Sequence, residues 1–153
     1  MKHSAEYYIE HLEMEPHVEG GYFKECLLEK EERNLWSSIY FMLAKGEVSH
    51  FHRLKSDEVW HHDGNALTIY MIDEAGKLTA AKLGLDLEKG EVPQVLVPKG
   101  MIFGSAMEEE GFSLVGCMVS PCFKYEEFEL FERKKLLEKY PEHSDVILRL
   151  TRE

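Results

Sequence analysis

The sequence contains few cysteines, few basic residues and no long apolar run, and each of these shortages excludes a class of protein. Its three cysteines, Cys26, Cys117 and Cys122, are an odd number and show no Cys-x-x-Cys spacing. A disulfide framework is therefore not expected, and a reduced, cytoplasmic chain is the simplest interpretation. No apolar run approaches the length of a membrane span, and the first residues lack the apolar core of a signal peptide.

Basic residues are outnumbered, since 18 lysines and arginines face 29 aspartates and glutamates, for a net charge of -11. A nucleic-acid surface needs clustered lysine and arginine, so we expect no nucleic-acid partner, and the same shortage argues against an anionic membrane surface. Hydrophobic residues make up 44% of the chain, which is enough for a packed core. The length of 153 residues predicts one domain over residues 1–153.

Short strand-like segments separated by turn residues fill most of the chain. They lie at about 22–28, 36–43, 67–72, 78–83, 94–97, 102–106 and 112–120. Helical spacing of apolar residues occurs only near the ends, after Ser4 and again at about 132–139 and 144–150. The pattern predicts an all-β sandwich or barrel at about 18–131, followed by a helical tail at about 132–153.

The stretch 46–64 carries the residues best suited to chemistry. His50 and His52 alternate along one strand, so we expect their side chains on the same face of a sheet. A second same-face set on the next strand consists of Glu58, Trp60 and His62. Two antiparallel strands joined by residues 53–57 would bring both sets around one hollow.

Two kinds of chemistry fit this group of residues. Two histidines and a carboxylate, here His50, His52 and Glu58, can form a metal site with open positions. The same imidazoles can instead hydrogen-bond to Glu58 and Tyr40 without an ion, and a histidine beside a carboxylate is also a plausible pair for proton transfer. No cofactor is certain from the sequence, and a divalent metal ion stays a possible one.

These residues resemble motifs of the cupin superfamily. The first cupin motif is matched in order by Gly46, His50, His52, Glu58 and Gly64, and the second by Gly90 and the run 98–100, which reads Pro-Lys-Gly. Four further runs are similar to a small, uncharacterised cupin subfamily of bacteria and fungi. They are Glu-Gly-Gly-Tyr-Phe at 19–23, Ser-Asp-Glu-Val-Trp at 56–60, Val-Pro-Lys-Gly at 97–100 and Ser-Pro-Cys-Phe at 120–123, with Phe128.

The resemblance implies a single jelly-roll β-barrel with short N- and C-terminal helices, usually assembled as a homodimer and related in fold to nucleotide-sugar epimerases. It implies no established reaction. Two positions depart from the cupin motifs. The gap from His52 to the acid is longer than in the first cupin motif. Asp57 fits the spacing of that motif better, whereas Glu58 matches the subfamily. In addition, Phe103 stands where the second motif usually carries a histidine.

We therefore expect a small-molecule pocket inside the barrel, of the kind used by an isomerase or epimerase of a sugar or carbonyl compound. His52, Glu58 and Tyr40 are the expected proton-transfer residues. The expected ligand contacts are Glu25, Ser38, His50, Trp60, His62, Tyr70, Phe103 and Phe123. Whether the protein is an enzyme stays open, and the alternatives are a non-catalytic metabolite binder or sensor and a metal-dependent oxygenase. The apolar face of Ile39, Phe41 and Leu43 is expected to pair two subunits.

Overall fold

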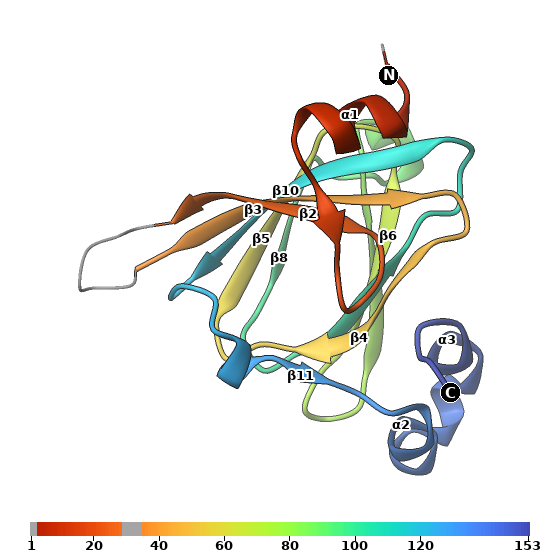
Figure 1. The fold of residues 1–153 in the computed structure, drawn as a ribbon. Coiled ribbons are helices and arrows are strands. Elements are labelled where there is room, and N and C mark those ends of the chain that lie inside the picture. Colours follow the sequence, from red (N-terminus) through yellow and green to blue (C-terminus); the bar gives the residue numbers. More distant parts are fainter. Residues whose placement is uncertain (1–2, 29–34) are drawn as a thin grey trace.

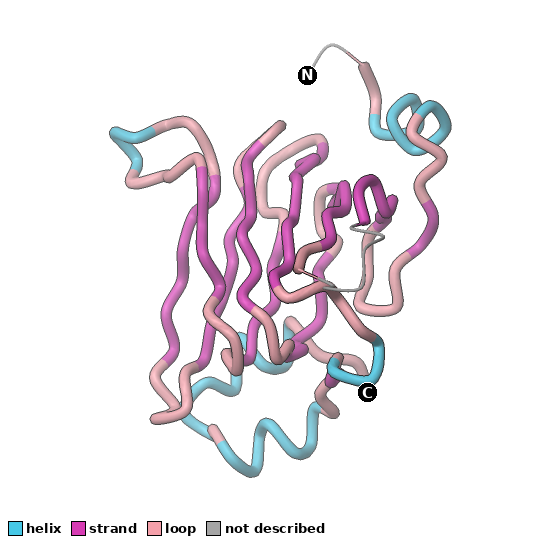
Figure 2. Tube along the Cα trace, turned by 90° about the vertical axis from the view of Figure 1, so that its left-hand side faces the viewer, coloured by secondary structure: helices cyan, strands magenta, loops and turns pink. Residues whose placement is uncertain are grey.

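Two antiparallel sheets face each other and enclose the interior of the protein (Figures 1 and 2). The computed structural model describes residues 3–28 and 35–153, and the side chains of all of these except residues 27 and 28. The six-stranded sheet has the order β1-β2-β3-β10-β5-β8, and the five-stranded sheet has the order β11-β4-β9-β6-β7. The predicted all-β jelly-roll barrel with short terminal helices is confirmed.

The strands are between two and nine residues long. The strands of the six-stranded sheet are β1 (Glu15–Pro16), β2 (Tyr22–Leu28), β3 (Ser37–Ala44), β5 (Asp57–His62), β8 (Gln94–Val97) and β10 (Phe112–Ser120). Those of the five-stranded sheet are β4 (Val48–Arg53), β6 (Leu67–Ile72), β7 (Leu78–Leu83), β9 (Ile102–Ala106) and β11 (Glu129–Leu130). The helices are α1 (Ala5–His11), α2 (Arg133–Lys139) and α3 (Ser144–Arg149), with single 3-10 turns at Leu87–Lys89, Tyr125–Glu127 and Pro141–His143.

Helices pack on the outer faces of the two sheets. Ser4 caps α1 by accepting a hydrogen bond from the Tyr7 backbone amide at 3.3 Å, and the apolar face of α1 packs on the outer side of β3 and β10 near Met42 and Phe112. On the other sheet, α2 and α3 lie close together beside β4 (Figure 1), and Phe51 joins Leu136 and Ile147 in a second buried cluster. No described helix is long and apolar enough to cross a membrane.

The faces of β3 are the reverse of those expected from its sequence. Ile39, Phe41 and Leu43 point into the barrel and pack in the main core, where Phe41 is 1% exposed and its ring lies 5.6 Å from that of Trp60. Tyr40 points outward and is 40% exposed. The predicted pairing face is therefore the interior wall of the barrel. The sequence is ambiguous here because Met42 is also apolar although it lies on the outer face of β3. It is buried there because α1 covers it.

This placement predicts very different costs for two neighbouring truncations. Phe41→Ala would leave a cavity in the main core and is expected to lower the free energy of unfolding by about 3–5 kcal/mol. Tyr40→Ala removes a ring that is 40% exposed and is expected to cost less than about 1 kcal/mol. Urea unfolding of both variants measures the difference, and equal costs would contradict the inward placement of Phe41.

Candidate functional site

A cavity of about 320 Å³ opens into the barrel between β2, β3, β4 and β5. Its polar lining consists of carboxyl groups from Glu15, Glu19, Glu25 and Glu58, the imidazoles of His17 and His52, the hydroxyl of Ser37 and the thiol of Cys117. Its apolar lining consists of Phe23, Ile39, Leu54, Val119, Phe123, Tyr125 and Phe128. Buried titratable groups beside aromatic rings make this cavity the candidate functional site.

Two glycines place Glu19 in the cavity wall. Gly20 and Gly21 have φ of +114° and +71°, a backbone region that side chains disfavour. A Cβ atom on Gly20 would lie 2.1 Å from the Val48 carbonyl oxygen, and one on Gly21 would lie 2.3 Å from the Met42 carbonyl oxygen. Only glycine fits this close approach, which holds the loop before β2 against β3 and β4 and buries the side chain of Glu19.

The carboxyl group of Glu19 contacts three polar side chains in the cavity wall. Ser49 Oγ donates a hydrogen bond to Oε1 at 3.0 Å. Oε2 lies 3.3 Å from His52 Nε2 and 3.5 Å from His17 Nδ1. Burial raises the pKa of Glu19 to about 7 and lowers the pKa of His52 to about 4. Burial also lowers the pKa of His17.

The hydrogen bonds of the two imidazoles determine where the protons lie. His52 Nδ1 is 2.7 Å from the His50 carbonyl oxygen, which can only accept, so Nδ1 carries the hydrogen and Nε2 is bare. The backbone amide of Glu19 donates to His17 Nδ1 at 3.3 Å, so that nitrogen is bare as well. Two bare nitrogens therefore face Glu19 Oε2. Both imidazoles are therefore neutral, and the titratable proton of this group belongs to Glu19, whose pKa is raised to about 7.

Glu58 is the second buried carboxyl group of the cavity. It lies on β5 in register with Val97 and Val119 on the neighbouring strands, and it is 5% exposed. Its Oε2 has no hydrogen-bond partner among the described residues. Burial, and then the nearby carboxyl of Glu19, raise the pKa of Glu58 to about 8. Glu58 is therefore largely protonated at neutral pH and can donate a hydrogen bond into the cavity.

The structure brings four of the predicted site residues to this cavity, namely Glu25, His52, Glu58 and Phe123. Asp57, the alternative acid, is exposed and accepts a hydrogen bond from the Lys99 backbone amide at 2.8 Å. Two further predicted residues pack near the site without lining the cavity. The ring of Phe103 lies 4.0 Å from the ring of His52, and Trp60 lies in the core against Phe41.

The remaining predicted residues lie outside the cavity. Tyr40 and Ser38 are on the outer side of β3, so the proposed role of Tyr40 in proton transfer is not supported by its position. Tyr70 donates a hydrogen bond to Glu108 at 3.0 Å and packs against the buried cluster that contains Leu136 and Ile147. His62 is four residues beyond Glu58 on β5, which corresponds to about 13 Å along the strand.

The expected metal triad of His50, His52 and Glu58 does not assemble. An irregularity in the pairing of β4 with β9 between Ser49 and His52 disturbs the alternation, and His50 turns its Nδ1 to the Glu19 carbonyl oxygen. Among residues 3–28 and 35–153, no three histidine, cysteine, aspartate or glutamate side chains are arranged to hold a metal ion. The carboxyl and imidazole groups around Glu19 contact one another directly instead of facing a common point.

His17 and Glu19 are the main site residues that the sequence argument missed. The signal available was a histidine and an acid directly before the double glycine, in the Glu-Gly-Gly-Tyr-Phe run that carried part of the family resemblance. Phe128 was also named in that resemblance but was not assigned to the ligand site. The contact of Glu19 with His52 joins segments 33 positions apart, and no local pattern encodes it.

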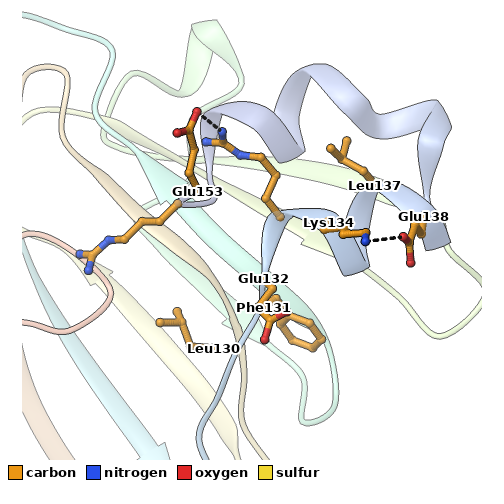
Figure 3. Close-up of a pocket in the computed structure, with 9 residues that line it drawn as sticks. Leu130, Phe131, Glu132, Lys134, Leu137, Glu138 and Glu153 are labelled. Carbon is orange, nitrogen blue, oxygen red and sulfur yellow. Dashed lines mark hydrogen bonds and ion pairs between the residues drawn. The ribbon is translucent and has the colours of Figure 1, made fainter.

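A larger hollow of about 830 Å³ lies at the C-terminal helices (Figure 3). Its charged side chains pair with one another, as in the Lys134–Glu138 contact at 3.9 Å and the Arg133–Glu153 contact at 3.3 Å. These groups are mostly exposed, and the hollow contains no imidazole or buried carboxyl group. It therefore lacks the chemistry of the smaller cavity.

Comparisons with known proteins agree with the fold. Residues 6–131 match the family described as Cupin superfamily (DUF985). A crystal structure of a protein from Shewanella oneidensis is 56% identical, with a TM-score of 0.94 and 98% of each chain covered. A hypothetical protein from Leishmania major is 34% identical, with a TM-score of 0.92, covering 99% of this chain and 100% of the other.

More distant structures share the fold alone. An oxalate decarboxylase variant from Bacillus subtilis is 16% identical, with a TM-score of 0.61, covering 88% of this chain and 36% of the other. Mn(II) centres are described for that decarboxylase. A comparison with curated proteins found no match.

The raised pKa of Glu58 predicts a specific pH dependence of stability. Because Glu58 holds its proton up to about pH 8 in the folded state but only up to its ordinary value of 4.5 when unfolded, stability is lost as the pH rises between these values. Glu58→Gln removes this loss. We expect similar melting temperatures for both proteins at pH 5, and a variant more stable by about 5 °C or more at pH 8.5. A constant difference across this range would contradict a protonated Glu58.

Proposed function

The chain belongs to the cupin superfamily, and we propose that its barrel cavity isomerises a small carbonyl compound by moving a proton next to the carbonyl group. One observation carries this proposal. The bare Nε2 of His52 lies 3.3 Å from the carboxyl of Glu19, and a second carboxyl, that of Glu58, lines the same cavity with an Oε2 that has no hydrogen-bond partner among the described residues. A base, a group that stabilises its charge and an acid thus share one small space.

Each of the three groups has a distinct role in the proposed reaction. In the reacting form Glu19 is ionised, and His52 Nε2 removes the proton from the carbon next to the carbonyl group. The imidazolium that forms is stabilised by the Glu19 carboxylate 3.3 Å away. Glu58 gives its proton to the carbonyl oxygen, which yields a neutral enol. In an epimerisation the proton returns from His52 to the opposite face of the same carbon once the enol has turned, and the enol hydroxyl returns its proton to Glu58. In an isomerisation the proton goes to the former carbonyl carbon, and the hydroxyl on the neighbouring carbon gives its proton to Glu58 and becomes the new carbonyl.

Metal-assisted chemistry, including the oxygenase alternative, is less well supported. The superfamily contains metal-binding members, but the part of this chain that the structure describes forms no matching ligand set. His50 turns away from the cavity, and Phe103 packs on the ring of His52 where the motif usually carries a further histidine. We therefore assign no step of the proposed reaction to a metal ion.

The proposed roles predict a narrow pH optimum. Glu19 must lose its proton and Glu58 must keep its proton, and their pKa values are about 7 and about 8. The rate is expected to rise as the pH increases through about 7 and to fall as it increases above about 8. The Glu58→Gln variant should be slower and should lose the alkaline limb of the profile. A rate that is independent of pH between 6 and 9 in the unsubstituted protein would contradict these assignments.

The direct test measures hydrogen exchange in heavy water. Free glucose, fructose, xylose and dihydroxyacetone are incubated with the protein, and NMR detects loss of the hydrogen next to the carbonyl group. We expect exchange in at least one compound, slowed by about 100-fold or more in His52→Gln because the base is removed. Tyr40→Phe is the matched control, because Tyr40 is outside the cavity, and its rate should stay within about twofold.

Two results would overturn the proposal. Equal loss of exchange in both variants would show that His52 has no special role. Thermal stabilisation by one of these compounds without exchange would identify a binding or sensor protein, the non-catalytic alternative, because a ligand that binds only the folded state raises its melting temperature without turnover.

A further inference from the structure

The described lining of the cavity offers no lysine or arginine side chain to a ligand. Four glutamates line it, and no lysine or arginine is among its described lining residues. The nearest basic side chains of β4 and the following turn, Arg53 and Lys55, line a separate groove together with Lys99. Arg53 is already paired there, since its Nε donates to Glu129 at 3.0 Å. A phosphate or carboxylate that entered the cavity would leave water and gain no counter-charge.

The inner part of the cavity is also poorly suited to a cation. A proton on Glu19 can be donated to one of the bare nitrogens of His17 and His52, and in this form the group of three side chains carries no net charge. Burial raises the pKa of Glu58 to about 8 and that of Glu19 to about 7, so a buried cation gains a charge partner only where one of these carboxyls gives up its proton. The other two carboxylates, Glu15 and Glu25, are exposed at the rim, where water screens them.

The polar and apolar surfaces of the cavity fit one kind of functional group. Glu58 is 5% exposed, and its Oε2 has no hydrogen-bond partner among the described residues. A protonated carboxyl in this position is a donor for a carbonyl oxygen. The rings of Phe123 and Phe128, with centroids 6.1 Å apart, belong to the same lining and offer apolar surface for a small ring. The volume of about 320 Å³ is at the lower end for ligand pockets and suits a single ring.

We infer that the substrate is an uncharged carbonyl compound about one ring in size, such as a free aldose or ketose, and not a phosphorylated, carboxylated or nucleotide-linked form. This inference rests on the proposed function and narrows its substrate class. The absence of cations among the described lining residues selects against anions, and the carboxyl of Glu58 selects for a carbonyl oxygen.

The test uses three probes that share one ring and differ in charge: cyclohexanone, cyclohexylamine and cyclohexanecarboxylate. Their dissociation constants are measured at pH 7 by ligand-observed NMR, with the shift in melting temperature as a second readout. We expect the ketone to bind at least tenfold more tightly than either charged probe. Carboxylate or amine binding as tight as the ketone would overturn the inference, and so would failure of all three to bind.

Substitutions test which residues set the preference. Glu58→Gln keeps an uncharged donor and should bind the ketone within threefold of the unsubstituted protein, whereas Glu58→Leu should weaken it at least fivefold. Glu25→Lys changes only an exposed side chain at the rim, so this variant can still test the charge preference if the Glu58 variants do not fold. It should improve carboxylate binding at least threefold, and unchanged binding would contradict the charge argument.

The test of ligand charge can succeed or fail independently of the hydrogen-exchange test of the proposed reaction. The probes report binding alone, so a preference for the ketone without hydrogen exchange in any sugar would keep the inference about ligand charge and remove catalysis. Exchange in a sugar phosphate or sugar acid, at a rate above that of the free sugar, would keep the proposed reaction and overturn the inference.

Discussion

The contact between Glu19 and His52 inside the barrel is the constraint on which the site depends. It places an acidic side chain from the loop before β2 against an imidazole on β4, in a space where neither group is solvated. Two glycines allow the loop to approach within the distance that this contact needs. The cost of burying the carboxyl is reduced by the hydrogen bond from Ser49 and by a shared proton, so the two groups are coupled in their protonation.

This coupling explains why the interior can be acidic in composition yet nearly uncharged at rest. The chain has a net charge of -11, and four glutamates reach this one cavity. The two outer glutamates keep contact with water, whereas burial raises the pKa of the two inner ones to about 7 and about 8. An uncharged interior with available acids and bases is the environment in which a proton can move to and from a bound carbonyl compound at low cost.

The fold was largely predictable because its signals are local. Alternation along the strands and turn residues between them indicated an all-β barrel, and apolar spacing after Ser4 and in the tail indicated helices at both ends. On β5 the inward position of Glu58 followed from the shared face of Glu58 and Trp60. Alternation fails where both faces of a strand are covered, as in β3, whose outer Met42 is buried by α1.

The site was predicted only in part because its main contacts are not local. The irregular pairing between Ser49 and His52 separates His50 from the cavity, and strand periodicity gives no indication of it. His17 and Glu19 belong to a loop, where no periodicity applies, and their partner His52 lies more than 30 positions away. Tyr40 was assigned by its place in the sequence of β3, and the alternation of that strand turns it outward.

The most direct test of the account is the protonation state of the inner cavity, measured by NMR of the ring nitrogens of His52 and the side-chain carboxyl carbons of Glu19 and Glu58. We predict a neutral imidazole with hydrogen on Nδ1 from pH 5 to 8, and carboxyl groups that titrate near pH 7 and pH 8. An imidazole of His52 protonated on both nitrogens at pH 6, beside carboxylates already ionised at pH 5, would contradict the account.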